Sequence, residues 1–130
     1  MTDAFDADVL IHAATPGRFR DASKAAIVAS ETRMGSVILL PEVLIKPLRI
    51  GNQRETDEIA EMLATFELKH VDEEVADAAV TLGAKYRLRT PDAIHLATAV
   101  VWGAERFYTH NTKDFGSHIT EVDVVHPAGV

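Results

Sequence analysis

The sequence contains no cysteine, which excludes disulfide bonds and thiolate metal sites and leaves oxygen and imidazole groups as the available metal ligands. It also contains no apolar run that reaches the ~18 residues of a membrane-spanning helix. The first residues, Met1 to Ala4, carry no positive side chain and so lack the basic start of a signal peptide. We therefore expect a cytoplasmic protein with no membrane partner.

Positive charge is in short supply, since 13 Lys and Arg residues stand against 20 Asp and Glu residues, for a net charge of −7. A surface of this charge is a poor partner for nucleic acid, unless bound cations offset carboxylates that gather at a metal site. The rest of the composition, 47% hydrophobic and 25% charged, is ordinary for a globular protein. The length of 130 residues predicts one domain over residues 1–130.

Apolar segments alternate with amphipathic ones along the first part of the chain. An apolar approach to Asp6 predicts a short strand, after which Val9 to Ala14 predict the start of a helix. An apolar stripe predicts a second helix over residues 18–33, ended by Gly35. The continuous apolar run Val37 to Leu40 predicts a strand that is covered on both faces.

Pro41 and Glu42 open the next predicted helix, and Pro47 inside that helix predicts a kink or a break. The remaining predicted elements are a helix over 56–66, a strand over 66–71, a helix from 72 to about 88, a buried helix from 90 to 102, and strands at 107–109 and 122–125. Because strands alternate with helices, we predict an α/β fold, with a mostly parallel central sheet in a three-layer α/β/α sandwich.

Polar side chains follow several of the predicted strands. Asp6 ends the first strand, and the segment from Asn111 to Asp114 follows the strand that ends near residue 109. Glu42 and Asp92 each come directly after a proline in the first turn of a helix. Because the carboxyl ends of parallel strands meet at one edge of a sheet, we expect these groups to converge.

Carboxylates forced together repel one another unless a cation neutralises them. Mg²⁺ takes oxygen ligands and uses one or two protein carboxylates directly, so we hypothesise that Asp6 anchors a magnesium-type site. A metal held in this way lowers the pKa of a bound water and stabilises charge on a phosphodiester. The pattern therefore favours hydrolysis of a nucleic-acid backbone.

Each acid also has a purely structural interpretation. Glu42 and Asp92 fit first-turn acids that the helix dipole favours, a contribution of about 0.3–1 kcal/mol. Asp6 fits a helix cap, and Asp114 fits an ordinary turn acid. The convergence of unrelated segments on one edge favours the site over these separate explanations.

Two further polar residues lie close to the predicted site in sequence. Asp8 fits a helix cap or a group that hydrogen-bonds behind the ligands better than it fits a ligand. His95 lies one turn past Asp92 on the same helix face, where a buried histidine with satisfied hydrogen bonds is the favoured interpretation and contact with the site is the alternative.

Four segments, in their order and spacing, resemble the PIN-domain ribonucleases and most closely the VapC-like toxins of toxin–antitoxin pairs. They are Phe5-Asp6-Ala7-Asp8-Val9-Leu10-Ile11, Leu40-Pro41-Glu42-Val43-Leu44, Thr90-Pro91-Asp92-Ala93-Ile94-His95-Leu96-Ala97-Thr98-Ala99 and Phe107-Tyr108-Thr109-His110-Asn111-Thr112-Lys113-Asp114-Phe115. The resemblance covers nearly the whole chain, and its third segment is the most specific. It implies a compact α/β/α sandwich that cleaves RNA with Mg²⁺ or Mn²⁺. It also implies a homodimer and inhibition by a cognate antitoxin protein whose tail enters the acidic groove.

Carried over residue by residue, the resemblance puts Asp6, Glu42 and Asp92 on the family's metal-site acids, with Asp6 and Asp92 as direct metal ligands. Many members have an acid where this chain has Asn111, so the chain departs from the fullest acidic set there. Asp114 is the alternative fourth catalytic acid. Without it, the site would have three carboxylates and hold a single ion.

Two other functions stay open. The start Asp6-Ala7-Asp8 also resembles phosphatases of the haloacid dehalogenase type, in which the first Asp is a nucleophile, but the chain has no adjacent Asp pair. The second alternative is a PIN-like module that binds RNA or a partner, with catalysis weakened at Asn111. RNA requires cationic contacts. The candidates are Arg18, Arg20, Lys46, Arg49, Arg87, Arg89 and Lys113.

Overall fold

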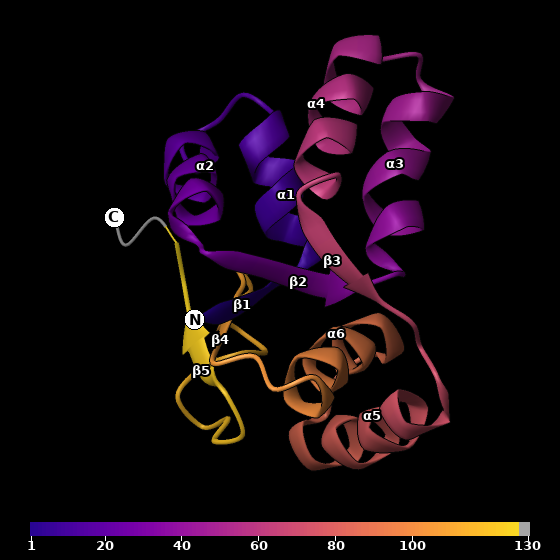
Figure 1. The fold of residues 1–130 in the computed structure, drawn as a ribbon, viewed down its shortest axis with the longest axis vertical. Coiled ribbons are helices and arrows are strands. Elements are labelled where there is room, and N and C mark those ends of the chain that lie inside the picture. The colour runs from indigo at the N-terminus through magenta and orange to yellow at the C-terminus, as the bar shows by residue number, and fades with distance from the viewer. Residues whose placement is uncertain (128–130) are drawn as a thin grey trace.

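The computed structural model describes residues 1–127, in which every strand belongs to one parallel sheet (Figure 1). The strands are β1 (Thr2–Phe5), β2 (Thr32–Ser36), β3 (Phe66–Lys69), β4 (Arg106–Tyr108) and β5 (Asp123–Val125). They lie in the order β3-β2-β1-β4-β5, and each neighbouring pair is parallel. The predicted α/β class with a mostly parallel sheet is confirmed.

Helices cover both faces of this sheet (Figure 1). On one face lie α1 (Ala7–Ala14), α2 (Arg20–Ala29), α3 (Leu39–Arg49) and α4 (Gln53–Leu63), and on the other lie α5 (Glu73–Tyr86) and α6 (Thr90–Val101). Consecutive residues of a strand point to opposite faces, so Phe5 packs in the core on the α1–α4 side, while Ala4 packs in the core beneath α5 and α6. Within residues 1–127, no helix has both the length and the apolar character that a bilayer crossing demands.

The segment around the second strand differs from the prediction. The helix predicted over residues 18–33 is shorter, because α2 ends at Ala29 and β2 follows. Gly35, predicted to end a helix, lies inside β2. The predicted strand Val37–Leu40 is wrong, because α3 begins at Leu39.

Packing explains why residues 32–36 form a strand and why residues 37–40 do not. β2 is hydrogen-bonded to β1 on one side and to β3 on the other, which satisfies its backbone groups despite its polar sequence. Leu39 is fully buried while Leu40 is 37% exposed, so the apolar run is the start of an amphipathic helix. α3 runs unbroken through the buried Pro47, so the break that Pro47 allowed does not form. The other predicted elements are present, with ends that shift by up to three residues.

The order of the strands creates one reversal in the sheet. The chain builds outward from β1 through β2 to β3, then returns to place β4 on the other side of β1. Ligand sites in open parallel sheets lie outside the carboxyl ends of the strands at such a reversal. Asp6 directly follows β1 and Thr109 directly follows β4, so both stand at this position.

Candidate metal-binding and catalytic site

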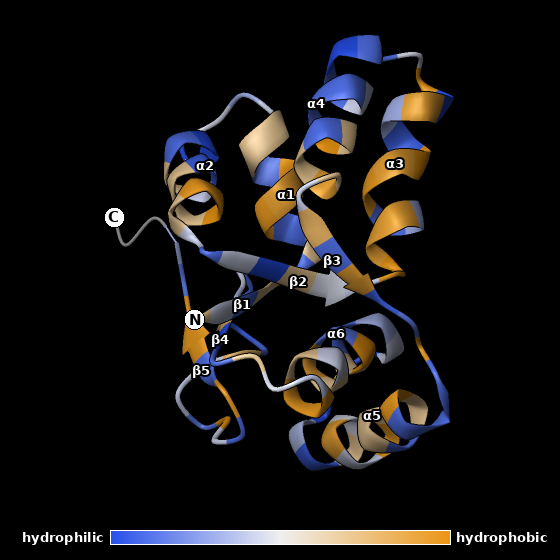
Figure 2. Ribbon diagram, viewed as in Figure 1, coloured by the Kyte–Doolittle hydropathy of each residue, from blue (hydrophilic) through white to orange (hydrophobic). Residues whose placement is uncertain are grey.

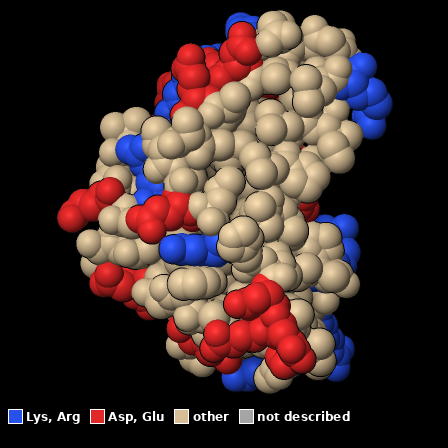
Figure 3. All heavy atoms as spheres, turned by 45° about the vertical axis from the view of Figure 1, so that its right-hand side comes forward, with Lys and Arg blue, Asp and Glu red and all other residues tan. Residues whose placement is uncertain are grey.

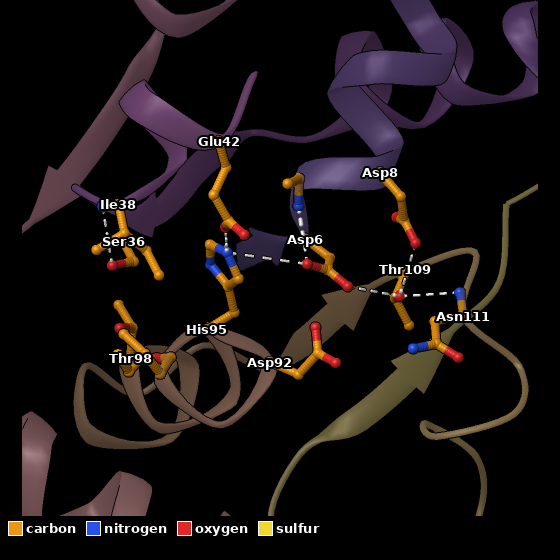
Figure 4. Close-up of polar contacts among 12 residues, drawn as sticks. Asp6, Asp8, Ser36, Ile38, Glu42, Asp92, His95, Thr98, Thr109 and Asn111 are labelled. Atoms are coloured by element: carbon orange, nitrogen blue, oxygen red, sulfur yellow. Dashed lines mark hydrogen bonds and ion pairs between the residues drawn. The ribbon is translucent and has the colours of Figure 1, made fainter. Parts of the chain in front are cut away.

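Asp6 is held by both of its carboxylate oxygens at the start of α1 (Figure 4). Its side chain caps the helix, with Oδ1 accepting a hydrogen bond of 2.8 Å from the backbone N–H of Ala7. Oδ2 accepts one of 2.9 Å from the hydroxyl of Thr109. Asp6 is only 5% exposed. The cap interpretation and the site interpretation of this residue therefore apply together.

The Thr109 hydroxyl links the ends of β1 and β4. Besides Asp6, it lies 3.3 Å from Oδ2 of Asp8, and it accepts a hydrogen bond of 3.1 Å from the backbone N–H of Asn111. Both oxygens of Asp8 accept from the backbone N–H of His110 at 3.1 Å. Asp8 thus fixes the loop after β4 to α1. This agrees with its interpretation as a group that hydrogen-bonds behind the ligands.

Asp92 reaches the same space from the other layer of the sandwich. It stands in the first turn of α6, and Figure 4 shows its carboxylate pointing toward Asp6 and Thr109. Oδ2 of Asp92 is buried and has no hydrogen-bond partner, although Nε of Arg89 lies 3.7 Å away in an ion pair. A buried carboxylate oxygen without a hydrogen bond is costly, so this atom has capacity to accept a ligand in addition to its ion pair with Arg89.

Glu42 faces the site through His95 (Figure 4). Nε2 of His95 donates a hydrogen bond to Oε1 of Glu42, and it lies 4.0 Å from Oδ1 of Asp6. His95 is 3% exposed, and its Nδ1 has no hydrogen-bond partner. The imidazole is therefore a bridge between two of the predicted acids, and the interpretation of His95 as a fully satisfied core residue is wrong.

Asn111 and Asp114 form a closed pair at the rim. The amide Nδ2 of Asn111 donates to Oδ2 of Asp114 at 3.0 Å, and the backbone N–H of Asp114 donates to Oδ1 of Asn111 at 3.0 Å. The charge of Asp114 still acts on Asp92, because it helps to raise the pKa of Asp92. Asp114 therefore lies within electrostatic reach of the pocket but is turned toward its own loop.

Burial and crowding destabilise the charged forms of the central acids. Burial raises the pKa of Asp6 from 3.8 to about 6, with a further contribution from the Asp8 carboxylate and an opposing one from His95. Burial also raises the pKa of Asp8. It raises the pKa of Asp92 as well, where the charge of Asp6 is the next cause. These acids, which we call the acid pocket (Asp6, Asp8 and Asp92), lie close enough to oppose one another's ionisation.

The acid pocket fits a hard cation in its chemistry. Its donors are carboxylate oxygens, one of them lacks a hydrogen bond, and a doubly charged ion would relieve the repulsion among them. In their present orientations, no three acidic or imidazole side chains of residues 1–127 form a group that could hold a metal ion. Glu42 is engaged by His95 and Asp114 by Asn111, so these two would have to turn to join a ligand set.

Sequence reasoning missed one residue and one contact that organise this arrangement. Thr109 follows β4 directly, and the argument applied to the acids, position after a parallel strand, would have identified it. The contact between His95 and Glu42 joins residues that are 53 apart in sequence. No pattern within either segment reports it.

The fold and the site together define a parallel α/β/α sandwich domain with fully or partly buried acidic side chains at its strand reversal. The chain belongs to the PIN domain family, because the model of that family matches residues 4–117. Curated proteins give no match.

Several solved structures have the same fold. The chain is 29% identical to a chain of a toxin–antitoxin complex from Klebsiella pneumoniae, over 93% of this chain and 98% of that one, with a TM-score of 0.75. It is 13% identical to a chain of VapBC2 from Rickettsia felis bound to a promoter DNA fragment, over 98% and 99%, with a TM-score of 0.75. It is 18% identical to a chain of FitAcB from Neisseria gonorrhoeae, over 98% and 99%, with a TM-score of 0.77. These similarities show that the chain shares the fold of these structures.

Proposed function

We propose that this protein is a metal-dependent endoribonuclease and the toxin of a toxin–antitoxin pair, acting in the cytoplasm. The observation that carries the proposal is the Asp92 carboxylate, which points toward Asp6 at the strand reversal of a PIN domain and has a buried oxygen, Oδ2, that makes no hydrogen bond. Membership of the PIN family also removes the basis for the phosphatase alternative, because the family match spans residues 4–117.

Asp6 and Asp92 would hold the ion, with Mg²⁺ or Mn²⁺ matching their oxygen donors. Such an ion would lower the pKa of a bound water and stabilise charge on a phosphodiester. The other residues act on these two: Thr109 fixes the orientation of Asp6, and His95 holds Glu42 beside it. Glu42 is the candidate base that would orient an attacking water, since its side chain is one-third exposed. Asp114 is the candidate fourth acid.

An RNA substrate requires positive potential near the pocket, and the charge of this chain is unevenly spread. Figure 3 shows acidic side chains gathered toward the bottom of that view, where α5 lies, and toward its top, near α4. Lys and Arg side chains line the right-hand margin of the same view. Lys46 and Arg49 stand in the last turn of α3, and Arg89 precedes α6. Cations of this kind support contact with the phosphates of an RNA backbone.

The similarity to a chain of a toxin–antitoxin complex from Klebsiella pneumoniae supports an antitoxin partner. An exposed apolar surface on α3 supports protein partners in general. Figure 2 colours α3 as hydrophobic along most of its length, and Ile45, Leu48 and Ile50 are 57%, 62% and 60% exposed. A monomer gains nothing from such a surface, which is the kind that a homodimer or an antitoxin would cover. A short reading frame for a DNA-binding protein beside the gene would support this role.

The test is RNA cleavage by the purified protein in Mn²⁺ and in EDTA. We expect cleavage that requires the metal and falls at least about 100-fold in Asp6→Asn and Asp92→Asn, as is typical when charge stabilisation of a transition state is removed. Glu74→Gln, an exposed acid of α5, is the matched control and should keep full activity. Cleavage that survives EDTA, or that survives both Asn substitutions, contradicts the proposal.

A second candidate is a PIN-like module that binds RNA or a partner without cleaving it. The pairing of Asn111 with Asp114 favours it, because that pair occupies the fourth acid in a contact within its own loop. Asn111→Asp separates the two functions. If the wild-type chain is inactive and Asn111→Asp gains metal-dependent cleavage, the module is supported. Cleavage by the wild-type chain supports the enzyme.

A further inference from the structure

Three aromatic rings from separate segments lie together beside the acid pocket. His12 belongs to α1, Phe19 directly precedes α2, and His110 follows Thr109. The ring centroids of Phe19 and His110 are 4.8 Å apart, those of His12 and His110 are 4.8 Å apart, and those of His12 and Phe19 are 5.2 Å apart. We call these three residues the aromatic cluster.

The aromatic cluster is rigidly tied to the acid pocket. The backbone N–H of His110 is bound by both oxygens of Asp8, and Nε2 of the His110 ring lies 2.7 Å from the hydroxyl of Ser23, which is fully buried in α2. The neighbouring Thr109 binds Asp6. His110, one member of the cluster, is therefore held one residue away from the group that orients Asp6.

Phe19 differs from the other phenylalanines of the chain in its exposure. The protein has five phenylalanines, and the other four are at most 9% exposed in the core. Phe19 is half-buried, as are His12 and His110. The guanidinium of Arg18 lies 4.6 Å from the centre of the Phe19 ring. The cluster thus combines partly open rings with an exposed cation.

His110 contributes a ring without a charge. Burial, with smaller contributions from the nearby His12 and His126, lowers its pKa to about 4. At neutral pH this imidazole is uncharged, so a ligand would meet a neutral aromatic surface at this position. Burial lowers the pKa of His12 as well.

The charge of the chain makes such a surface useful to an RNA-binding protein. With a net charge of −7, contacts to phosphates supply less of the affinity than they do in a basic protein. Base stacking on aromatic rings is independent of net charge and tolerates any sequence, and Arg adds a cation–π contribution. An acidic nuclease therefore has reason to hold its substrate by stacking.

We propose that the aromatic cluster is a stacking subsite for one nucleobase of single-stranded RNA, next to the phosphate held at the acid pocket. Phe19 and His110 provide the stacking surface, and Arg18 reinforces it. The proposal rests on the proposed ribonuclease function and adds to it the residues that position the substrate.

The test measures binding apart from cleavage. A fluorescein-labelled eight-nucleotide single-stranded RNA of mixed sequence is titrated against the full chain carrying Asp92→Asn, with and without Phe19→Leu. Loss of one stacked base should weaken binding about tenfold. Phe19→Tyr keeps a ring and should retain the affinity. Trp102→Leu is the matched control, because Lys69 lies 4.6 Å over that exposed ring at the opposite end of α6 from Asp92. It should leave binding unchanged.

A scan of abasic probes tests stacking itself. An abasic site at one particular position should weaken binding to the parent but not to the Phe19→Leu variant, because the stacking contact is already lost there. Equal binding by parent and Phe19→Leu overturns the subsite, and so does a loss that is the same for every abasic probe. A loss of antitoxin binding with RNA binding intact also overturns it. Unchanged thermal unfolding of Phe19→Leu and Phe19→Tyr links the binding effect to the ring.

The subsite and the proposed function fail in different ways. If the wild-type chain neither binds nor cleaves RNA, the ribonuclease proposal fails and the subsite fails with it. If the wild-type chain cleaves RNA with a metal and Phe19→Leu leaves both KM and RNA affinity unchanged, only the subsite is overturned. A rise in KM with kcat unchanged supports the subsite.

Discussion

Nε2 of His95 donates a hydrogen bond to Glu42, 53 residues away in the sequence, and lies 4.0 Å from a carboxylate oxygen of Asp6. This imidazole is the only group in Figure 4 that is drawn with contacts to both acids. It joins α6 to α3 across the edge of the sheet, so it couples the packing of the two layers to the geometry of the site.

This contact allows the structural and functional roles of Glu42 to be separated. Glu42→Ala leaves the buried His95 without a partner on either ring nitrogen, which should cost about 1–3 kcal/mol of the free energy of unfolding. Glu42→Gln retains an acceptor oxygen and should cost less than half of that. We nevertheless expect both variants to lose metal-dependent RNA cleavage. Urea unfolding and cleavage assays measure the two effects, and a Glu42→Gln enzyme with full activity would assign Glu42 a purely structural role.

The raised pKa of Asp6 predicts an unusual dependence of stability on pH in the metal-free chain. The folded state binds a proton at Asp6 up to about pH 6, whereas the unfolded chain releases it near pH 3.8. Between these values the folded state binds more protons, so the contribution of Asp6 to the free energy of unfolding falls as the pH rises and is lowest above pH 6.

Asp6→Asn removes this penalty. In EDTA at pH 7 we expect the variant to unfold at a higher temperature than the wild type, with the difference shrinking toward zero as the pH approaches 4. Glu74→Gln should show no such trend, since that side chain is exposed. A wild type that is more stable than Asp6→Asn at pH 7 without metal would contradict the repulsion on which the proposed metal site rests.

Much of the fold follows from local sequence, because each local signal has a physical cause that persists in the structure. Asp72 caps α5 by accepting from the N–H of Val75, as a helix start requires. The apolar residues after Asp92 form a helix that is buried in the core, and Asp6 stands at a strand-to-helix junction. The convergence of Asp6 and Asp92 on one site was predicted from the rule that the carboxyl ends of parallel strands meet at one edge of the sheet.

The errors and omissions arise where tertiary contacts decide. The polar segment Thr32–Ser36 becomes a central strand because β1 and β3 bond to it on both sides, which its own residues do not indicate. The apolar run Val37–Leu40 fits a buried strand and the start of a helix equally well, since periodicity cannot separate the two over four residues. The contact between His95 and Glu42 likewise depends on how α3 and α6 approach each other.

Gly35 shows how such a contact constrains one position in β2. A Cβ atom at Gly35 would overlap Cδ1 of the fully buried Leu39 and would lie 3.8 Å from the carbonyl oxygen of Phe5. Gly35→Ala should therefore destabilise the fold by about 1–3 kcal/mol, the usual cost of overpacking. Leu39→Val removes the overlapping atom, so the double variant should lose less than the sum of the two single losses. Strict additivity in urea unfolding would show that the overlap is not the cause.

Removal of the Asp3 side chain should lower the stability of the fold and leave the site intact. This residue is fully buried in β1, where Oδ1 accepts from Nε of Arg106 at 2.8 Å and Oδ2 accepts from the hydroxyl of Ser30 at 2.6 Å. Asp3→Ala leaves the buried Ser30 hydroxyl without this acceptor, a loss of about 1–3 kcal/mol in the free energy of unfolding before any effect on Arg106. Glu105→Gln, an exposed neighbour, is the control and should change stability by at most about 0.5 kcal/mol.

Asp3 and Asp6 lie on the same short segment, and this makes the Asp3 variant informative about the mechanism. Asp3 stands two residues before the carboxyl end of β1, paired in register with Arg106, whereas Asp6 follows that end and bonds to Thr109. Well below its unfolding temperature, Asp3→Ala should therefore cleave RNA at the wild-type rate per folded molecule, while Asp6→Asn is inactive at any temperature. An inactive but folded Asp3→Ala would mean that the buried ion pair also sets the geometry of the acid pocket. Circular dichroism and cleavage measured on the same samples distinguish these outcomes.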